Sequence, residues 1–204
     1  MRNISEITIN GKALSEILEL NRKANGLWNA NLRNANLWSA DLWSADLWSA
    51  DLWSADLRNA NLRNADLRNA DLWNADLRNA NLRNAKNIPD YVVATTCILP
   101  EGDIIGWKKC ADNIIVKMKI PAKAKRSNAT GRKCRAEYVK VLQCYDDKHG
   151  ELPDDYIAYT DQNGPHTKYQ KGKNVKCDQW DDNRWNECSG GIHFFLTRYE
   201  AKQY

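Results

Sequence analysis

The chain has 204 residues, of which 43% are hydrophobic, a formal net charge of +4 and six cysteines. This length accommodates one or two small domains, and we expect two. No run of 18 or more apolar residues occurs, which excludes a transmembrane helix, and the N-terminus lacks the apolar stretch of a signal peptide, so we expect a cytoplasmic protein.

Residues 1–24 are expected to form an N-terminal strand and helix cap. The letters "EITIN" are typical of a short strand, Asn10-Gly11 is typical of a turn, and residues 12–24, "KALSEILELNRKA", place leucines along one side of a short helix. Because the open ends of a repeat array must be covered, we expect this segment to cover one end of the region that follows.

A five-residue repeat occupies residues 25–87. Leucine recurs at every fifth position from Leu27 to Leu82, and alanine recurs at every fifth position from Ala30 to Ala85. A period of five fits neither a helix nor a straight strand, so the chain must turn within every unit. If four units close a square turn of twenty residues, the twelve leucine-centred units make three coils with Leu and Ala inside.

The stretch "ANLRNADLRNADLWNADLRNANL" resembles the pentapeptide-repeat family, because the motif A(D/N)LXX is present in nearly every unit of residues 25–86. The resemblance implies a right-handed quadrilateral β-helix of about three coils and, for some members, inhibition of DNA gyrase by an acidic prism that imitates duplex DNA. Between Leu27 and Ala85, seven Asp stand against six Arg. This nearly neutral balance does not favour imitation of DNA.

The residue after each leucine is Trp or Arg, and at twenty residues per coil these side chains stack in four columns that each mix the two types. One interpretation is that Arg lies over Trp in cation–π contacts and each shields the other. The other is that exposed Trp side chains bind a protein partner or a second copy of the chain, since Trp and Arg dominate interface hot spots. The candidate interface residues lie on four neighbouring faces: Trp38, Trp43, Trp48 and Trp53.

The composition changes near Pro89, and residues 88–204 are expected to form a compact β-rich (α+β) C-terminal domain. Strands are predicted for "NIIVKMKI", "EYVKVLQCY", "YIAYT" and "GIHFFLTRY", and a short helix is predicted for the closing "TRYEAKQY". The six cysteines all lie after residue 90 without disulfide-like spacing, which favours free thiols in a reducing compartment.

Nine basic residues and one acid lie between Lys117 and Lys140. Such a cluster attracts a phosphate, a nucleotide or an acidic protein, while a solvated basic β-hairpin and contact with a nucleic-acid backbone are the alternatives. The candidate anion-binding residues of this segment are Lys125, Arg126, Ser127, Thr130, Arg132, Lys133 and Arg135.

Three further residues have two interpretations each. Cys134 lies between two cations that favour a reactive thiolate, or it is a small buried side chain. His193, on an apolar strand, is either a core histidine bonded to the backbone or a functional group, and Arg184 with its neighbouring Trp side chains either faces a ligand or packs the domain edge. No spacing matches a zinc site, so we expect no metal. No nucleophile is paired with a base at a recognisable spacing and no cofactor signature is present, so we expect no cofactor and no catalytic residue.

The stretches "GDIIGWKK", "IPAKAKRSNATGRKCRAEYVKVL" and "NRWNECSGGIHFFLTRYEA" resemble an uncharacterised domain that often follows pentapeptide repeats in phage and bacterial proteins. The segment "CSGGIH" is more weakly similar to the tail of phage lysis-inhibition accessory proteins. The resemblance implies a phage gene that acts in a bacterial cytosol, and no activity is assigned to the domain.

We therefore expect a non-enzymatic binding or inhibitor protein that captures or blocks a bacterial host protein in host takeover or counter-defence. The alternative is a sequestering receptor for a small anionic ligand, such as a nucleotide signal, that uses the basic domain. An enzyme that uses Cys134 or His193 is less favoured, as is a nucleic-acid partner, and no membrane partner is expected.

Overall fold

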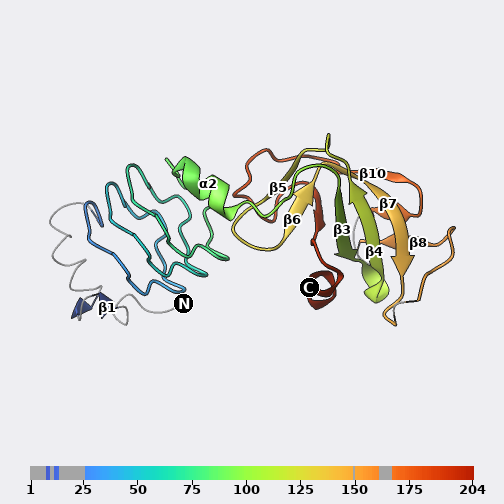
Figure 1. Ribbon diagram of the computed structural model, residues 1–204, viewed down its shortest axis with the longest axis horizontal. Helices are drawn as coiled ribbons and strands as arrows, with labels where there is room; N and C mark the ends of the chain where they lie inside the picture. Colours follow the sequence, from blue (N-terminus) through green and yellow to red (C-terminus); the bar gives the residue numbers. More distant parts are fainter. Residues whose placement is uncertain (1–7, 10–11, 14–25, 149, 161–166) are drawn as a thin grey trace. The chain divides into compact units, whose positions relative to one another are not determined.

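The computed structural model describes residues 8–9, 12–13, 26–148, 150–160 and 167–204, and these residues are mainly β (Figure 1). They divide into two compact units, which we describe separately. The first contains the chain through Cys97 together with Ala129–Gly131, and the second contains Ile98–Asn128 and Arg132–Tyr204. No described helix is long and apolar enough to cross a membrane.

Two short strands lie at the N-terminal side of the first unit. Strand β1 (Thr8–Ile9) pairs antiparallel with β2 (Lys12–Ala13). The strand predicted in "EITIN" is confirmed, whereas Lys12–Ala13 are strand and not the first residues of a helix, because pairing with β1 satisfies their backbone groups. The rest of the predicted cap helix, residues 14–24, lies outside the described residues.

In residues 26–87 the chain lies beside itself at intervals of twenty residues. Parallel bridges join Asn31 with Asp51 and continue from unit to unit as far as Asp66 with Lys86. Figure 1 shows these passes as successive turns of the blue-to-green trace. The leucine N–H groups donate across the passes, as from Leu47 to the carbonyl of Asp66 at 2.9 Å. The bridges therefore have the spacing that four five-residue units per turn require.

The interior of the repeats is apolar. All twelve leucines from Leu27 to Leu82 are at most 5% exposed, and most of the repeat alanines are buried with them. The predicted placement of Leu and Ala inside is thereby confirmed, and it leaves the Trp and Arg positions on the outer surface.

The Asp or Asn before each leucine from Leu32 onward closes the local turn. Its Oδ1 atom accepts the backbone N–H two residues later, as between Asp41 and Trp43 (3.2 Å) and between Asp51 and Trp53 (3.1 Å). The alanine N–H donates to the leucine carbonyl three residues earlier, as from Ala40 to Leu37 at 3.0 Å. Because the other N–H groups donate to the neighbouring pass, the backbone donors of a unit are satisfied, which explains why the motif demands Asp or Asn.

The second residue after each leucine adopts a left-handed conformation, with φ between 54° and 59° in all twelve units. Asparagine tolerates this region better than serine does, because its amide bonds to the local backbone. Eight of these positions are Asn, and four consecutive units instead carry Ser39, Ser44, Ser49 and Ser54.

We expect Ser44→Asn to raise the free energy of unfolding by about 0.5 kcal/mol, since part of the left-handed strain is relieved at an exposed position. Thermal denaturation followed by circular dichroism measures the change. The reverse substitution Asn64→Ser should lower stability by a similar amount, and equal stabilities for all three proteins would contradict the explanation.

The second unit is built from three antiparallel sheets. A four-stranded sheet has the order β10-β7-β4-β3, a three-stranded sheet has the order β11-β6-β5, and β8 pairs with β9. The strands are β3 (Ile104–Lys109), β4 (Ile115–Ile120), β5 (Arg126–Asn128), β6 (Cys134–Ala136), β7 (Tyr138–Tyr145), β8 (Ile157–Tyr159), β9 (Lys168–Gln170), β10 (Asn174–Lys176) and β11 (Ile192–Phe194). The strands predicted in "NIIVKMKI", "EYVKVLQCY" and "YIAYT" are confirmed. Of "GIHFFLTRY", only Ile192–Phe194 are strand, because the chain turns after β11 and Arg198 and Tyr199 already belong to helix α3.

Three short helices complete the described chain: α2 (Asp90–Thr96) in the first unit, and the 3-10 turn η3 (Ala111–Asn113) and α3 (Arg198–Gln203) in the second. Helix α3 is the predicted closing helix. It begins at a capping box in which the Thr197 side chain accepts the N–H of Glu200 and the Glu200 carboxylate accepts the N–H of Thr197.

The core of the second unit lies between its sheets. Val116, Met118 and Val141 are fully buried, and Phe194 of β11 packs into the same cluster. A side chain at Gly106 would place its Cβ 2.6 Å from the Phe194 ring, so β3 needs glycine at this point of close approach.

Candidate functional site

The outer surface of the repeats carries several large tryptophan side chains that are exposed to solvent, which is unusual unless they take part in binding. The exposed fractions are 40% for Trp28, 39% for Trp38, 58% for Trp43, 37% for Trp48 and 55% for Trp73. Of the four predicted interface residues, Trp38, Trp43 and Trp48 are therefore exposed, and Trp53 is half-buried.

The stacked columns contain two kinds of ring contact. Arg33 lies over the Trp53 ring, 4.5 Å from its centre, which confirms the predicted cation–π contact in that column. In another column Trp28 stacks on Trp48 with ring centres 5.0 Å apart and planes 9° from parallel. These contacts restrain the rings of Trp28, Trp48 and Trp53.

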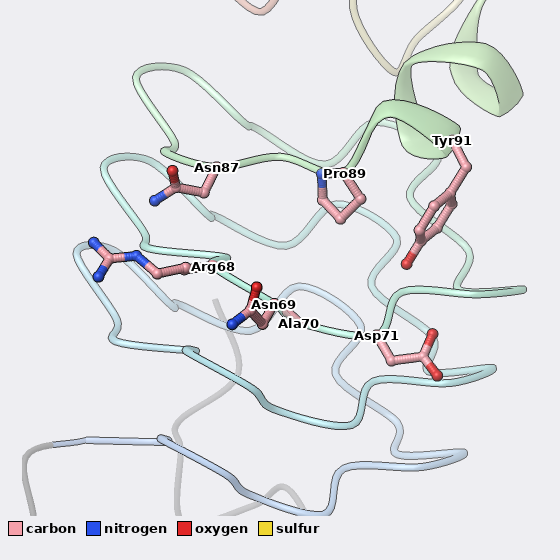
Figure 2. Close-up of a pocket in the computed structure, with 7 residues that line it drawn as sticks. All are labelled: Arg68, Asn69, Ala70, Asp71, Asn87, Pro89 and Tyr91. Carbon is pink, nitrogen blue, oxygen red and sulfur yellow. The ribbon is translucent and has the colours of Figure 1, made fainter.

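A polar cavity of about 520 Å³ lies at the last passes of the repeats. Figure 2 shows Arg68 and Asn87 at one end of it and Asp71 and Tyr91 at the other. The Tyr91 ring is also in edge contact with Trp73, with ring centres 5.6 Å apart, so an exposed tryptophan adjoins the cavity.

Tyr91 accepts a backbone N–H of the repeats through its hydroxyl group. Leucine N–H groups donate to a carbonyl nineteen residues later, but Leu72 donates to the Tyr91 hydroxyl oxygen instead, at 2.7 Å. Burial raises the pKa of Tyr91, so the hydroxyl is neutral. Tyr91 was not among the predicted site residues, and the signal that identifies it is its position nineteen residues after Leu72.

The predicted basic segment contains an antiparallel β-hairpin of β5 and β6. Lys125 pairs with Asp182 (3.1 Å), Arg132 pairs with Glu200 (2.6 Å), and the Lys133 ammonium donates to the hydroxyl of Tyr204 (2.6 Å).

The remaining candidate anion-binding residues of the basic segment donate hydrogen bonds to backbone carbonyls or are buried. Arg126 donates to the carbonyls of Gly102 (2.6 Å) and Pro100 (3.1 Å). The Thr130 hydroxyl, in the first unit, donates to the carbonyl of Ala80 (2.6 Å). The Ser127 hydroxyl is buried and has no hydrogen-bond partner among the described residues.

Arg135 is a buried cation, with 1% of its surface exposed. Its guanidinium donates to the carbonyls of Gly190 (2.6 Å), Asn183 (2.9 Å) and Asp181 (3.2 Å). The guanidinium also lies over the Trp180 ring, at 5.2 Å. Burial lowers the pKa of Arg135, and these contacts hold together the loop before β11.

Arg184 donates from Nε to the carbonyl of Asn128 (2.9 Å) and lies over the Trp185 ring at 4.6 Å, so this part of the chain packs within the domain. Cys134 is fully buried and its thiol donates to the carbonyl of Arg132 at 3.6 Å, which confirms the structural interpretation.

His193 is a core histidine bonded to the backbone. Its Nε2 atom lies 3.2 Å from the Glu187 carbonyl. A carbonyl can only accept, so Nε2 carries the hydrogen and Nδ1 is a bare acceptor when the ring is neutral. Burial, followed by the charges of Lys133 and Lys108, lowers the pKa of His193 to about 4, so the ring is neutral near pH 7.

This shift predicts a pH dependence of stability. Because the folded-state pKa lies below the ordinary value of 6.5, the unfolded chain binds the proton first as the pH falls. The stability that the folded chain gains from keeping His193 neutral is fully present above about pH 6.5 and is lost progressively between pH 6.5 and 4. We expect the urea midpoint of the wild type to fall across this window and that of His193→Gln to fall less. Parallel curves for the two proteins would contradict the prediction.

Within the described chain, no group of three or more His, Cys, Asp or Glu is arranged to hold a metal ion. All six cysteines are free, as predicted.

Five-residue units with Leu and Ala inside and Trp and Arg outside define a pentapeptide-repeat protein, and the model of pentapeptide repeats (8 copies) matches residues 27–64 and 45–84. Residues 94–201 match the model of a family of unknown function (DUF5758). This match covers more than half of the chain, and the chain belongs to that family. No curated protein matches the chain.

Proposed function

We propose that this chain is a non-enzymatic binding protein that captures or blocks another protein through the tryptophan-bearing faces of its repeats. The observation that carries the proposal is the exposure of five repeat tryptophans, from 37% to 58% of their surface. In the setting that the sequence resemblance implies, the chain is phage-encoded and its partner is a protein of the bacterial host.

The scaffold of this proposal is a right-handed quadrilateral β-helix of about three coils. Parallel bridges at intervals of twenty residues and the inward-facing leucines support this geometry. A backbone held in this way loses little conformational freedom when a partner docks, so the rings are presented at low entropic cost.

Trp43 is the expected anchor of the interface. It is the most exposed of the tryptophans, and its ring contacts no other ring or cation among the described residues. Large aromatic side chains of this kind supply most of the binding energy in interfaces. The stacked pair Trp28 and Trp48 offers a second, rigid apolar area.

The alternative functions have less support. A receptor for a small anion at the basic segment would need free cations there, but Lys125, Arg126, Arg132 and Arg135 already bind acids or carbonyls. An enzyme that uses Cys134 would need an accessible thiol, and this one is fully buried.

The test uses substitutions that the repeat itself tolerates, because Arg occupies the position of Trp in six of the twelve units. Full-length wild type and Trp43→Arg/Trp48→Arg are immobilised and exposed to lysate of the bacterial host. A partner retained by the wild type should be lost, or weakened at least tenfold, in the variant.

The control is Arg83→Gln, which changes an exposed residue of the same column as Trp43 and should retain the partner. Circular dichroism verifies that all three proteins fold, and light scattering detects self-association through the same rings. Equal retention by wild type and double variant would overturn the proposal.

A further inference from the structure

A second cavity, of about 290 Å³, lies within the second unit and is separate from the tryptophan-bearing faces. Strand β3 contributes Lys108, the ends of β8 and β9 contribute Thr160 and Thr167, and β11 contributes His193. The volume is close to the lower end of the range of ligand sites and leaves ample room for a group of a few heavy atoms.

Lys108 is the cation among the residues that line this cavity. Among the residues that the structure describes, its ammonium has no hydrogen bond and no ion pair, in contrast to Lys125, Lys133 and Lys171. Burial lowers the pKa of Lys108, and Lys133 adds to this effect. A half-buried cation without a partner is costly, and an anion that enters the cavity offsets this cost.

The electrostatic field around this cavity is positive, as is the charge of Lys108. Lys133, Lys108 and Arg135 all act on His193 in the direction that positive charge produces. Asp178 lines the cavity but is exposed and lies beyond ion-pair distance of Lys108. An anion is therefore favoured at the Lys108 side of the cavity.

The neutral side chains add a second requirement on the ligand. The Thr160 hydroxyl oxygen accepts the N–H of Thr167 at 3.0 Å, and among the described residues its own hydrogen has no acceptor. His193 uses Nε2 for the Glu187 carbonyl, which leaves Nδ1 as an acceptor. A ligand that fits presents anionic oxygens to Lys108 and Thr160 and an O–H to His193.

We infer that this cavity binds a phosphate group that carries an O–H, either as inorganic phosphate or as a phosphate monoester. Sulfate has a similar size and charge but carries no hydrogen near neutral pH, so the histidine acceptor discriminates against it. This is the selectivity that a site with a bare buried acceptor imposes.

Titration calorimetry of the full chain at pH 5.5, where a phosphate monoester still carries an O–H and His193 is still neutral, tests the inference with inorganic phosphate, sulfate and glycerol 3-phosphate as probes. We expect saturable binding of inorganic phosphate, and sulfate weaker by at least tenfold. Glycerol 3-phosphate distinguishes the two sources: its binding extends the site to monoesters, and its exclusion restricts the site to the free ion.

Lys108→Met should weaken phosphate binding at least tenfold, whereas Lys123→Met removes the same charge from an exposed position of the same unit and should change nothing. Thr160→Val provides a second variant if Lys108→Met does not fold, and it should also weaken binding. Absence of saturable phosphate binding, equal binding of sulfate, or an unchanged affinity in the folded Lys108 or Thr160 variant would overturn the inference.

Discussion

Replacing Arg135 by methionine is expected to lower the free energy of unfolding of the second unit by about 3–5 kcal/mol. The substitution removes the donors of three hydrogen bonds and leaves the carbonyls of Asp181, Asn183 and Gly190 without them. A loss of this size is a large part of the stability of an ordinary domain. Urea unfolding followed by tryptophan fluorescence measures it.

Arg135→Lys should recover little of this loss, because an ammonium is a point donor and cannot reach three carbonyls as the planar guanidinium does. The control is Arg132→Met, which breaks an exposed ion pair with Glu200 and should cost at most about 1 kcal/mol. If Arg135→Met were no more destabilising than Arg132→Met, the carbonyl contacts would not contribute as described.

Leu57→Ala is expected to lower the stability of the repeat unit by about 2.5–5 kcal/mol. Leu57 is fully buried, and the bridges between Asn36, Asp56 and Asp76 place it between the passes that carry Leu37 and Leu77. The hydrogen-bonded walls restrict collapse around the missing side chain, so the cavity remains and its cost is near the upper part of the usual range.

Thermal denaturation of the full chain, together with hydrogen exchange of the repeat amides, measures the effect in the correct unit. Leu57→Met keeps the volume and should cost less than about 1.5 kcal/mol. Faster exchange confined to the second unit, or equal stabilities of the two variants, would contradict the assignment of Leu57 to the interior.

The repeat region was predictable because its pattern is local. Each unit has the same five positions, so burial of Leu, exposure of Trp and a return after twenty residues follow from periodicity alone. The role of Asp41 and its equivalents was not predicted, because periodicity identifies faces and does not identify which backbone N–H a side chain accepts. Tyr91 was missed because it lies outside the repeat. Its hydroxyl accepts the N–H of Leu72, which other leucines of the repeat donate to a backbone carbonyl.

In the second unit, the sequence indicated strands, the β5–β6 hairpin and helix α3, but it did not determine the environment of the charged residues. The nine cations between Lys117 and Lys140 looked free because only one acid accompanies them in the sequence. Their partners, such as Asp182 for Lys125 and Glu200 for Arg132, lie 57 and 68 residues away. Distant and non-periodic pairings of this kind leave no local signal.

The sequence by itself thus determined the spacing of the repeats, their apolar interior and their Trp and Arg surface, since each depends on residues five or twenty positions apart. Only the tertiary structure decided that Arg135 is buried on three carbonyls, that His193 is neutral, and that Lys108 lines a cavity in which no described residue pairs with it. The physical reason is that a side chain's charge, partners and solvent access are set by strands that meet through folding, and the order of residues along the chain does not record which strands meet.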